Sequence, residues 1–473
     1  MNIVEKYPSY LLTVLLKSIK IHIDNYLYEM GDTVKKVDLT KGSVVRVLLA
    51  LAIPIMGSSL LQFAYNIVDM FWVGGLGKDA VASVGSSSFF VGLGYAINAC
   101  IVIGTGIKVA YSIGENKEIE AKEYIQTSML LNLLIGGMYA LFLVFVGPYL
   151  IGFLGIGDQV IEKQAYGYLL GSAPMLFFAF FNATFSRIFS SLGQTKSALQ
   201  ISIVGIVLNM ILDPIFIYSF KWGVLGAALA TLIAQMIMFF LYMKIGGKWF
   251  EFHWKKAFHS ERIKAIVNLG WAVAFQRILF TLINILLAKL IAKFGPEAIA
   301  AQKIGLQIES VTYMVTGGLN GAVASFTGQN YGAHYYKRIK KGYQVAIGLS
   351  ISYAVLTTTL FMIFAIPMAN IFVKDATTIQ MTSVYLQIIA YSQLFNAIEM
   401  VSNGWFTGIQ KPQIPATISI LFTALRLPMA WLLVIPLGLE GIWWSISIST
   451  LLKGSILYFC YKHYQGKLKE QEI

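Results

Sequence analysis

Long runs of apolar residues, separated by short polar loops, recur along the chain from Val45 to Tyr461. A helix needs about 20 apolar residues, at about 1.5 Å per residue, to cross the hydrocarbon core of a bilayer. The runs lack the ten-residue alternation of a membrane β-strand, so we predict an all-α membrane protein with twelve transmembrane helices. The predicted spans cover residues 45–74, 79–111, 124–150, 164–192, 198–218, 223–245, 266–292, 298–327, 343–373, 378–407, 413–435 and 438–461.

Composition and charge agree with this pattern. Hydrophobic residues make up 57% of the chain, and the mean hydropathy is +0.68. The net charge of +13 suggests nucleic acid in a soluble protein, but here 16 Lys and Arg lie in the loops of one side and 5 in those of the other. This asymmetry is the orientation signal of a multi-pass membrane protein. We expect a plasma-membrane protein with both termini in the cytoplasm and no nucleic-acid partner.

Cysteine and histidine usage gives no indication of catalysis. Cys100 and Cys460 lie far apart in the sequence, and all five histidines fall outside the spans. This argues against a disulfide framework, a metal cluster or an intramembrane enzyme. We expect no cofactor.

The segment before the first span has two interpretations of about equal weight. Leu12, Leu15 and Ile19 share one helical face, with Lys17 and Lys20 elsewhere, which predicts an amphipathic helix on the cytoplasmic membrane surface. The alternative is a poorly ordered tail.

Several short segments recur about 215 residues apart. "LGKDAVAS" from Leu76 aligns with "FGPEAIAA" from Phe294, Gly114 with Gly328, "LGQTK" from Leu192 with "TGIQK" from Thr407, and Pro214 with Pro428, at offsets of 214 to 218 residues. We infer two copies of a six-span unit. Six is an even number, so the copies share one orientation and are related by a pseudo-twofold axis along the membrane normal.

This repeat divides the chain. The predicted parts are a cytoplasmic extension (1–43), an N-lobe (44–245), a cytoplasmic linker (246–265), a C-lobe (266–462) and a cytoplasmic tail (463–473). Two such lobes permit alternating access, and no "GxxxxGK[ST]" motif supplies an ATP site, so a secondary transporter is favoured over a channel.

The repeat breaks at two acidic positions. Asp69 aligns with Leu287, and Asp213 aligns with Leu427. The fold therefore does not require these acids, although an aspartate at a helix centre costs about 2.5 to 3.5 kcal/mol on insertion scales. Such a cost points to a functional role in the N-lobe.

Polar residues stand at helical spacing beside the two acids, and Asp69, Asp213 and Thr231 lie at similar distances, about 8 to 12 Å, from the predicted outer helix ends. The polar residues and the acids are Gln62, Tyr65, Asn66 and Asp69 in the first span, Asn209 and Asp213 in the fifth, and Thr231 in the sixth. If these helices are neighbours, the groups form one site. Two carboxylates in a low dielectric repel each other and can take up a proton, and the same oxygens suit a small cation such as Na⁺.

The alternative interpretation is structural. In that case Asp69 caps a helix or reaches the outer interface, and Asp213 bonds to backbone loosened by Pro214.

In these residues and their order, the chain resembles the multidrug and toxic compound extrusion (MATE) transporters, and more closely their prokaryotic DNA-damage-inducible (DinF-like) branch. The resemblance covers residues 43–462. It rests on "NIVDMFWVGGLG", "GENKEIEAK", "GQNYGA", "RIFSSLGQTK", and "NMILDPIFI" followed by "GVLGAALATLI", in the family's order.

The resemblance implies antiport of amphipathic, often cationic organic compounds against H⁺ or Na⁺ by a protein that we expect to be monomeric. The resemblance implies that the coupling ion binds at Asp69, Asn209, Asp213 and Thr231, which form a metal site only if the ion is Na⁺. It implies that the cargo binds near Gln62, Tyr65, Asn66 and Asn182, and that the first helix bends at Pro54.

The C-terminal half departs from a second branch of the family. It has no Asp or Glu in residues 266–292 and has Asn396 in the tenth span, so a C-lobe cation site of that branch is not expected. Arg277, Glu309, Glu399 and Arg426 do lie in this half, and we expect internal pairs such as Arg426 with Glu309 or Glu399. Arg277 and Arg426 also give some support to an alternative function, a flippase for lipid-linked saccharides.

Overall fold

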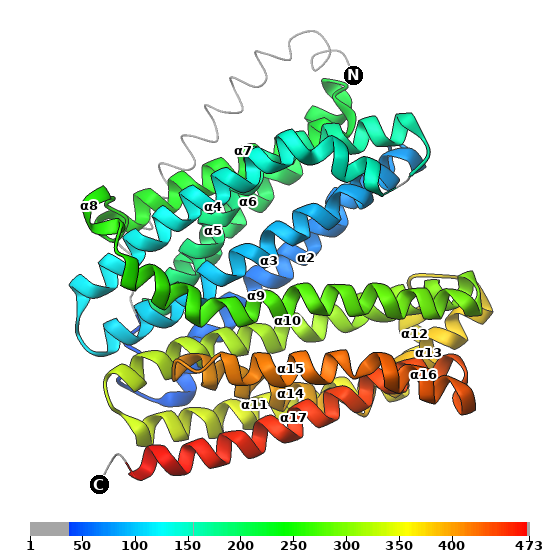
Figure 1. The fold of residues 1–473 in the computed structure, drawn as a ribbon. Helices are drawn as coiled ribbons and strands as arrows, with labels where there is room; N and C mark the ends of the chain where they lie inside the picture. The colour runs from blue at the N-terminus through cyan, green and yellow to red at the C-terminus, as the bar shows by residue number, and fades with distance from the viewer. Residues whose placement is uncertain (1–36, 155, 471–473) are drawn as a thin grey trace. The chain divides into compact units, whose positions relative to one another are not determined.

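The structure, a computed structural model, describes residues 37–154 and 156–470, and these residues form helices and turns without a strand (Figure 1). Nine helical spans in this part are long and apolar enough to cross a membrane. They are α2 (Val44–Gly74), α3 (Lys78–Gly114), α4 (Glu118–Phe153), α5 (Gln159–Ser191), α6 (Thr195–Pro214) with η1 (Ile215–Ser219), α7 (Gly223–Gly246) with η2 (Gly247–Trp249), α9 (Ser260–Ile291) with η3 (Ala292–Phe294), α11 (Tyr336–Ile363), and α15 (Gln413–Ala424) with α16 (Arg426–Leu437).

Three more helical segments lie where spans were predicted. They are α10 (Pro296–Gly332), α13 (Ala376–Ala390) with α14 (Gln393–Gly408), and α17 (Leu439–Glu470). Charged residues such as Glu309 and Lys453 lower the hydropathy of α10 and α17, and α13 and α14 are each short. With these three segments, the predicted all-α fold with twelve spans is confirmed.

Two short helices lie outside this scheme, α8 (Trp254–Ala257) in the basic loop and α12 (Ala365–Asn370) after α11. The predicted amphipathic helix falls on residues outside the described part of the chain. Local chemistry accounts for several helix starts. The Asp158 carboxylate accepts hydrogen bonds from the N–H groups of Val160 and Ile161 at the start of α5, and Gly295, with φ 100°, precedes Pro296 at the start of α10.

The contacts divide the described chain into two compact units. Unit 1 holds Val37, Leu61–Thr105 and Lys122–Lys264, and unit 2 holds Asp38–Leu60, Gly106–Ala121 and the chain from Ala265 onward. The units therefore differ from a simple division of the sequence into halves, since the first part of α2 and the last part of α3 pack with the C-terminal helices.

Unit 1 is built around the packing of α5 on α7. Gly171 of α5 permits this approach, because a Cβ atom there would lie 2.8 Å from the Ala228 Cβ on α7. The rings of Phe185 and Phe250, with centroids 4.2 Å apart, and the buried Tyr242 extend the contact toward the end of α7. Small residues and aromatic rings thus fix the helices that carry the candidate site.

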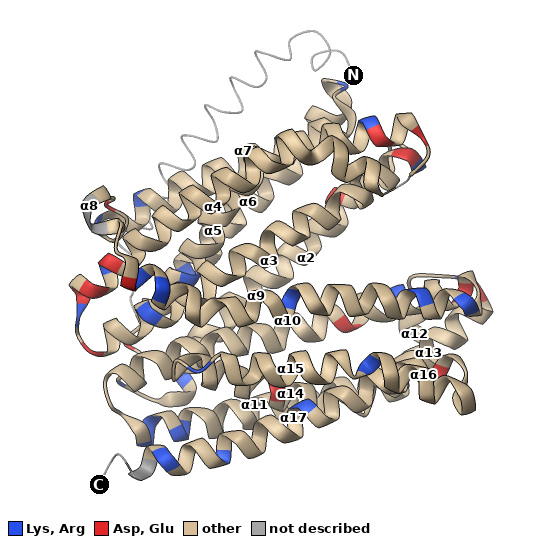
Figure 2. Cartoon of the chain, viewed as in Figure 1, with Lys and Arg blue, Asp and Glu red and all other residues tan. Residues whose placement is uncertain are grey.

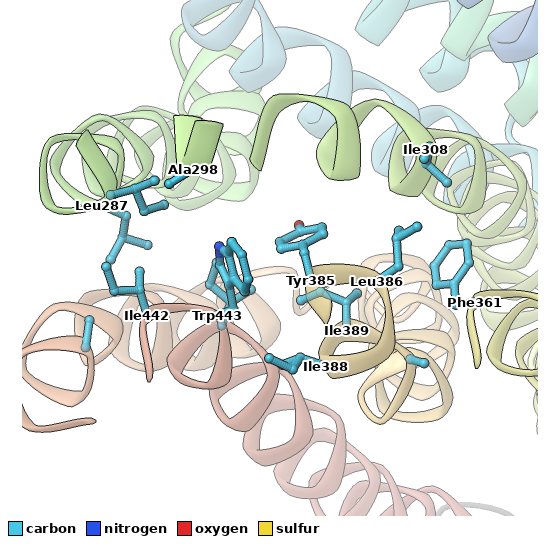
Figure 3. Packing of buried hydrophobic residues seen from close by; sticks show 14 of the residues in the cluster. Leu287, Ala298, Ile308, Phe361, Tyr385, Leu386, Ile388, Ile389, Ile442 and Trp443 are labelled. Carbon is cyan, nitrogen blue, oxygen red and sulfur yellow. The ribbon is translucent and has the colours of Figure 1, made fainter. Parts of the chain in front are cut away.

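Unit 2 has a continuous hydrophobic core between α9, α10, α13 and α17 (Figure 3). Leu287 and Ile308 belong to this core together with Tyr385 and Trp443, whose rings meet edge to face at 5.6 Å. Leu287, which aligns with Asp69 in the repeat, is 2% exposed and belongs to this core, and Leu427 packs against it. Leucine satisfies the packing at these positions, so the acids of unit 1 are not needed to form the fold.

Charged side chains lie mostly at the helix ends and in the loops, with few along the middle of the helices (Figure 2). This distribution is that of a membrane protein, because charge is costly in the hydrocarbon layer. The few charged residues within the spans are therefore candidates for a functional role.

Candidate ion-coupling site

The candidate site lies in unit 1, where α2, α6 and α7 meet. Thr231 of α7 connects the three helices. Its Oγ1 lies 3.2 Å from the Tyr65 hydroxyl of α2 and 3.3 Å from the Asn209 Nδ2 of α6. Thr231 also donates to the carbonyl of Ala227 one turn earlier, at 3.0 Å. That bond uses the only hydroxyl proton of Thr231, so Tyr65 and Asn209 both donate to its oxygen.

Asn209 also forms a hydrogen bond with Asp213, the acid of α6. Its Nδ2 donates to the Asp213 Oδ1 at 3.2 Å, one turn along the helix. Asp213 is fully buried, and it precedes Pro214 and the π-helix η1. A π-helical turn frequently marks a functional site, because it shifts the following residues out of α-helical register.

Asp69 of α2 supplies the second carboxylate. It is partly buried and interacts electrostatically with Asp213 and Tyr65. In the described part of the chain, no ion pair links Asp69 or Asp213 to a basic side chain. The two acids thus belong to one cluster of electrostatically interacting groups in unit 1, and their role in an ion site stays a prediction.

The oxygen atoms of this cluster suit a proton or a small hard cation. The Asp213 Oδ2 and the Asn209 Oδ1 are buried without a hydrogen-bond partner. Orphaned oxygens beside carboxylates are what a proton or Na⁺ would satisfy. The described residues contain no group of three or more His, Cys, Asp or Glu side chains arranged for a metal, so a transition-metal centre is not indicated.

The residues predicted to line the cargo site are more dispersed. Gln62 and Asn66 of α2 are exposed, and the Gln62 Nε2 lies 3.4 Å from the Asn66 Oδ1. Asn182 of α5 is 4% exposed and donates to the Gln235 carbonyl and Oε1 at 2.8 and 2.7 Å. Pro54 is buried in the part of α2 that belongs to unit 2. Neither these residues nor Pro54 form a hydrogen bond or ion pair with Asp69 or Asp213 in the described part of the chain, whereas Tyr65, the fourth residue predicted for the cargo, interacts electrostatically with both acids.

Sequence analysis missed two residues near the site. Tyr168 of α5 interacts electrostatically with Asp69 and Asp213, and Gln235 is the partner of Asn182. Gln235 stands one turn after Thr231 on α7, so extending the polar stripe would have found it. Tyr168 has no such signal, because a tyrosine in an apolar span is more often a packing residue.

The charges of unit 2 form a different arrangement. Glu399 of α14 accepts from Lys453 of α17 at 3.0 Å and from Ser419 at 2.9 Å, and both members of the ion pair are buried. Lys453 was not singled out from the sequence. Arg426 donates to Ser449 at 2.6 Å.

The expected direct pair between Arg426 and a glutamate is absent from the ion pairs of the described residues. Glu309 instead accepts from Tyr385 at 2.9 Å and interacts with Arg426 only electrostatically. The basic partner of Glu399 is Lys453, which the sequence expectation did not consider.

Comparison with known proteins agrees with this architecture. The sequence model of the MatE family matches residues 54–215 and again 272–432, more than half of the chain. The chain belongs to the MatE family of membrane transporters. The two matches begin 218 residues apart and confirm that the chain contains two copies of one unit.

Three characterised or named relatives are similar over most of their length. The FAD transporter of Shewanella oneidensis is 27% identical over 448 residues, covering 89% of this chain and 95% of the relative. The probable multidrug resistance protein NorM of Thermotoga maritima is 25% identical, with coverage of 86% and 90%. The multidrug export protein MepA of Staphylococcus aureus is 24% identical, with coverage of 87% and 92%. All three are described as transport or resistance proteins rather than enzymes.

Solved structures show the same fold. A crystal structure of MATE in complex with MaL6 has a TM-score of 0.87 and 23% identity, covering 93% of this chain and all of the other. An outward-facing multidrug resistance MATE transporter has a TM-score of 0.86 and 23% identity, covering 92% and 99%. The chain is thus a multi-pass plasma-membrane protein whose relatives move small molecules. Its assignment to the DinF-like branch stays a prediction.

Proposed function

We propose that the chain is a secondary active antiporter that exports amphipathic, often cationic organic compounds in exchange for H⁺ or Na⁺. The coupling ion binds at the cluster of Asp69, Asn209, Asp213 and Thr231. The observation that carries this proposal is the pair of electrostatically interacting carboxylates, which form no ion pair with a basic side chain in the described part of the chain and stand where the second repeat has leucines.

Charge supplies the mechanism. When the site faces outward, a proton or Na⁺ neutralises Asp69 and Asp213, which changes α2 near Pro54 and weakens the binding of a cationic cargo. The cargo leaves, the lobes change access, and the ion dissociates into the cytoplasm. The carboxylates are then charged again and favour a new cationic cargo. Pro54 is suited to a bend, because proline removes one backbone hydrogen bond of the helix.

Separate ion gradients test the proposal. The purified protein is reconstituted in vesicles, a pH gradient or a Na⁺ gradient is imposed alone, and the movement of a fluorescent cationic dye is followed. We expect one gradient to drive transport. Because one relative is described as an FAD transporter, FAD belongs among the tested cargoes.

Substitution of the acids gives the first residue-level prediction. Asp69→Asn and Asp213→Asn should each reduce gradient-driven transport at least tenfold while protein abundance stays near normal. The matched control is Asp79→Asn, since Asp79 is exposed at the start of α3 and has no contact with the cluster. Unaltered efflux in both Asp69 and Asp213 variants would refute the site.

A flippase for a lipid-linked saccharide is the second candidate. Arg277 is exposed on α9 within a span, where an arginine is costly unless it meets water or an anionic group. Transport of a fluorescent lipid-linked saccharide that is insensitive to both ion gradients, with no dye movement, would favour this candidate. The remaining parts of the proposal are a monomeric state and cytoplasmic termini.

A further inference from the structure

An apolar cluster of unit 1 lies between the candidate ion site and the predicted outer ends of the helices that carry it. Its members are buried side chains of α2, α3, η1 and α7, namely Val73, Ala80, Val84, Ile217, Val224 and Ala227. We call these six residues the outer plug. Val73, Ile217 and Ala227 are each at most 1% exposed, so the plug is closely packed.

The plug follows the site on each of the three helices. A plug residue and a site residue stand four positions apart, which is about 6 Å along an α-helix. In each pair the plug residue is the one nearer to the predicted outer helix end. The pairs are Val73 with Asp69 on α2, Ile217 with Asp213 across α6 and η1, and Ala227 with Thr231 on α7.

Tyr168 connects the plug to the acids. Its side chain packs against the plug, and it interacts electrostatically with both Asp69 and Asp213. Asp213 itself is 0% exposed. An apolar layer beside a buried carboxylate excludes ions from that direction, because an ion that enters the layer loses its hydration.

A hydrogen bond between α2 and η1 joins the two chain segments that carry the plug. The Tyr218 hydroxyl donates to the Trp72 carbonyl at 2.5 Å, and the two rings meet edge to face with centroids 6.1 Å apart. Trp72 lies in the last turn of α2, whose carbonyls lack the usual helical partner. Since Trp72 precedes Val73 and Tyr218 follows Ile217, this bond holds both plug residues together.

The π-helix accounts for the reach of Tyr218. In an α-helix, a residue five positions after Asp213 would point about 140° away from it. The π turn, with the Phe220 N–H donating to the Ile215 carbonyl at 2.9 Å, brings residues five positions apart more nearly into line. Gly75 completes the fit, because a Cβ atom there would overlap the Tyr218 hydroxyl and lie 3.3 Å from its Cζ.

We propose that Tyr218 is a positioning residue that holds the outer plug closed over Asp69 and Asp213, so that the coupling ion has no direct path from the outer helix ends to the carboxylates. The inference rests on the proposed function, since a seal matters only where alternating access moves an ion. An ion that passed through the plug would bypass the exchange for cargo. Loss of the Tyr218 hydroxyl therefore uncouples ion movement from cargo movement.

Thiol labelling measures how often the plug opens. In a background with Cys100→Ser and Cys460→Ser, Val73→Cys places a small, weakly polar thiol in the plug. A small membrane-impermeant methanethiosulfonate is then applied to intact cells. Tyr218→Phe keeps the ring and removes the hydroxyl, and it should raise the labelling rate about fivefold, because a hydrogen bond contributes about 1 kcal/mol net. Gly75→Ala should act similarly, since the new methyl group displaces the hydroxyl.

Two matched substitutions serve as controls for this labelling. Gly74→Ala, beside Gly75, meets nothing within 4 Å. Tyr149→Phe removes the hydroxyl of a tyrosine that is 78% exposed on α4. Both should leave the labelling rate unchanged. An unchanged rate in Tyr218→Phe, or an equal rise in the controls, would overturn the inference.

Ion flux links the seal to the site and separates this inference from the transport proposal. In vesicles without cargo, Tyr218→Phe should raise the flux of the ion whose gradient drives wild-type transport, and Tyr149→Phe should not. Faster labelling without added ion flux would mean a loosened helix end that does not seal the site, which contradicts the inference. If neither gradient drives transport by the wild type, the transport proposal fails, and the labelling rates alone decide whether Tyr218 holds the plug closed.

Discussion

The buried acids of the two units differ in how their charge is balanced. In unit 2, Glu399 has Lys453 at 3.0 Å, and Glu309 receives a tyrosine hydroxyl. In unit 1, Asp213 receives the amide of Asn209, and its second oxygen has no hydrogen-bond partner in the described part of the chain. A buried charge without a partner is unfavourable, so the proposed function predicts that unit 1 gains stability when an ion binds, whereas unit 2 carries its own counterion.

The ion pair of unit 2 gives the second prediction. Lys453→Met leaves Glu399 buried without its cation and should destabilise the protein by about 3 to 5 kcal/mol. The double variant Lys453→Met with Glu399→Gln should recover part of this loss, because the remaining group is neutral. Unfolding in mild detergent measures both effects.

The control for this ion pair is an exposed lysine. Lys462→Met removes only a cation–π contact and should cost below about 1 kcal/mol. Equal destabilisation by Lys453→Met and Lys462→Met would mean that the buried pair contributes nothing specific.

At the residue scale, comparing the two repeats identified the acids that occur in one repeat and not in the other. Asp69 and Asp213 stood out because their counterparts are leucines, and Thr231 followed from its depth in the span. Lys453 and Tyr168 did not, because a lone lysine or tyrosine in a span says nothing about its partner. Their roles depend on how the helices pack. Lys453, for example, contacts Glu399, which lies 54 residues earlier in the chain.

Among the helices, the contact between α5 and α7 depends on small residues and gives the third prediction. Gly171→Ala should destabilise unit 1 by about 1 to 3 kcal/mol, because the new methyl group would meet the Ala228 Cβ, which cannot move without its helix. Gly167→Ala, one turn earlier on α5, meets nothing within 4 Å and should be neutral or stabilising. Thermal unfolding of the two variants makes the comparison, and similar losses would contradict the close packing.

The start of α13 gives the fourth prediction. The Thr378 N–H and hydroxyl both donate to the Asp375 carboxylate at 2.7 Å, and these bonds hold the pKa of Asp375 below its usual range. A lowered pKa means that the cap stabilises the helix above about pH 4 and that this contribution is lost as the pH falls further.

Hydrogen exchange tests this cap. After correction for intrinsic rates, the first amides of α13 should lose protection in acid in the wild type. In Asp375→Ala, protection should already be low at neutral pH and should change little with pH. Pronounced acid sensitivity in this variant as well would assign the effect to another group.

At the element scale, the predicted spans and helices agree, whereas breaks within spans were only partly predictable. The turn at Leu425 comes three residues before Pro428, and a proline inside a helix lacks an N–H and clashes with the carbonyl four residues earlier, here that of Ala424. The break at Tyr391 and Ser392 has no proline or glycine nearby, so no local signal marks it. The π-helix η1 does follow Pro214, but proline alone does not distinguish a kink from a π turn.

For the whole molecule, the loop charges predict the orientation and give the fifth prediction. In a background with Cys100→Ser and Cys460→Ser, a membrane-impermeant maleimide should label the Lys293→Cys variant in intact cells. It should label the Lys248→Cys variant only after permeabilisation, because residue 248 lies in the most basic loop. Both positions are exposed. The reverse pattern would invert the topology.

The molecule's division was the least predictable feature. The repeat predicted two lobes separated at residues 246–265, yet the compact units assign the first part of α2 and the last part of α3 to the C-terminal helices. Sequence periodicity reports which segments are homologous, and it carries no information on which of them pack together.

The Glu399–Lys453 pair also constrains how the chain is made. Glu399 is synthesised 54 residues before the lysine that neutralises it, so α14 reaches the membrane with an unbalanced acid while α17 is still to be translated. On insertion scales, placing such a charged group at the centre of a span costs about 2.5 to 3.5 kcal/mol. We therefore expect the tenth span to be less stably inserted in a chain that ends before residue 453 than in one that includes α17.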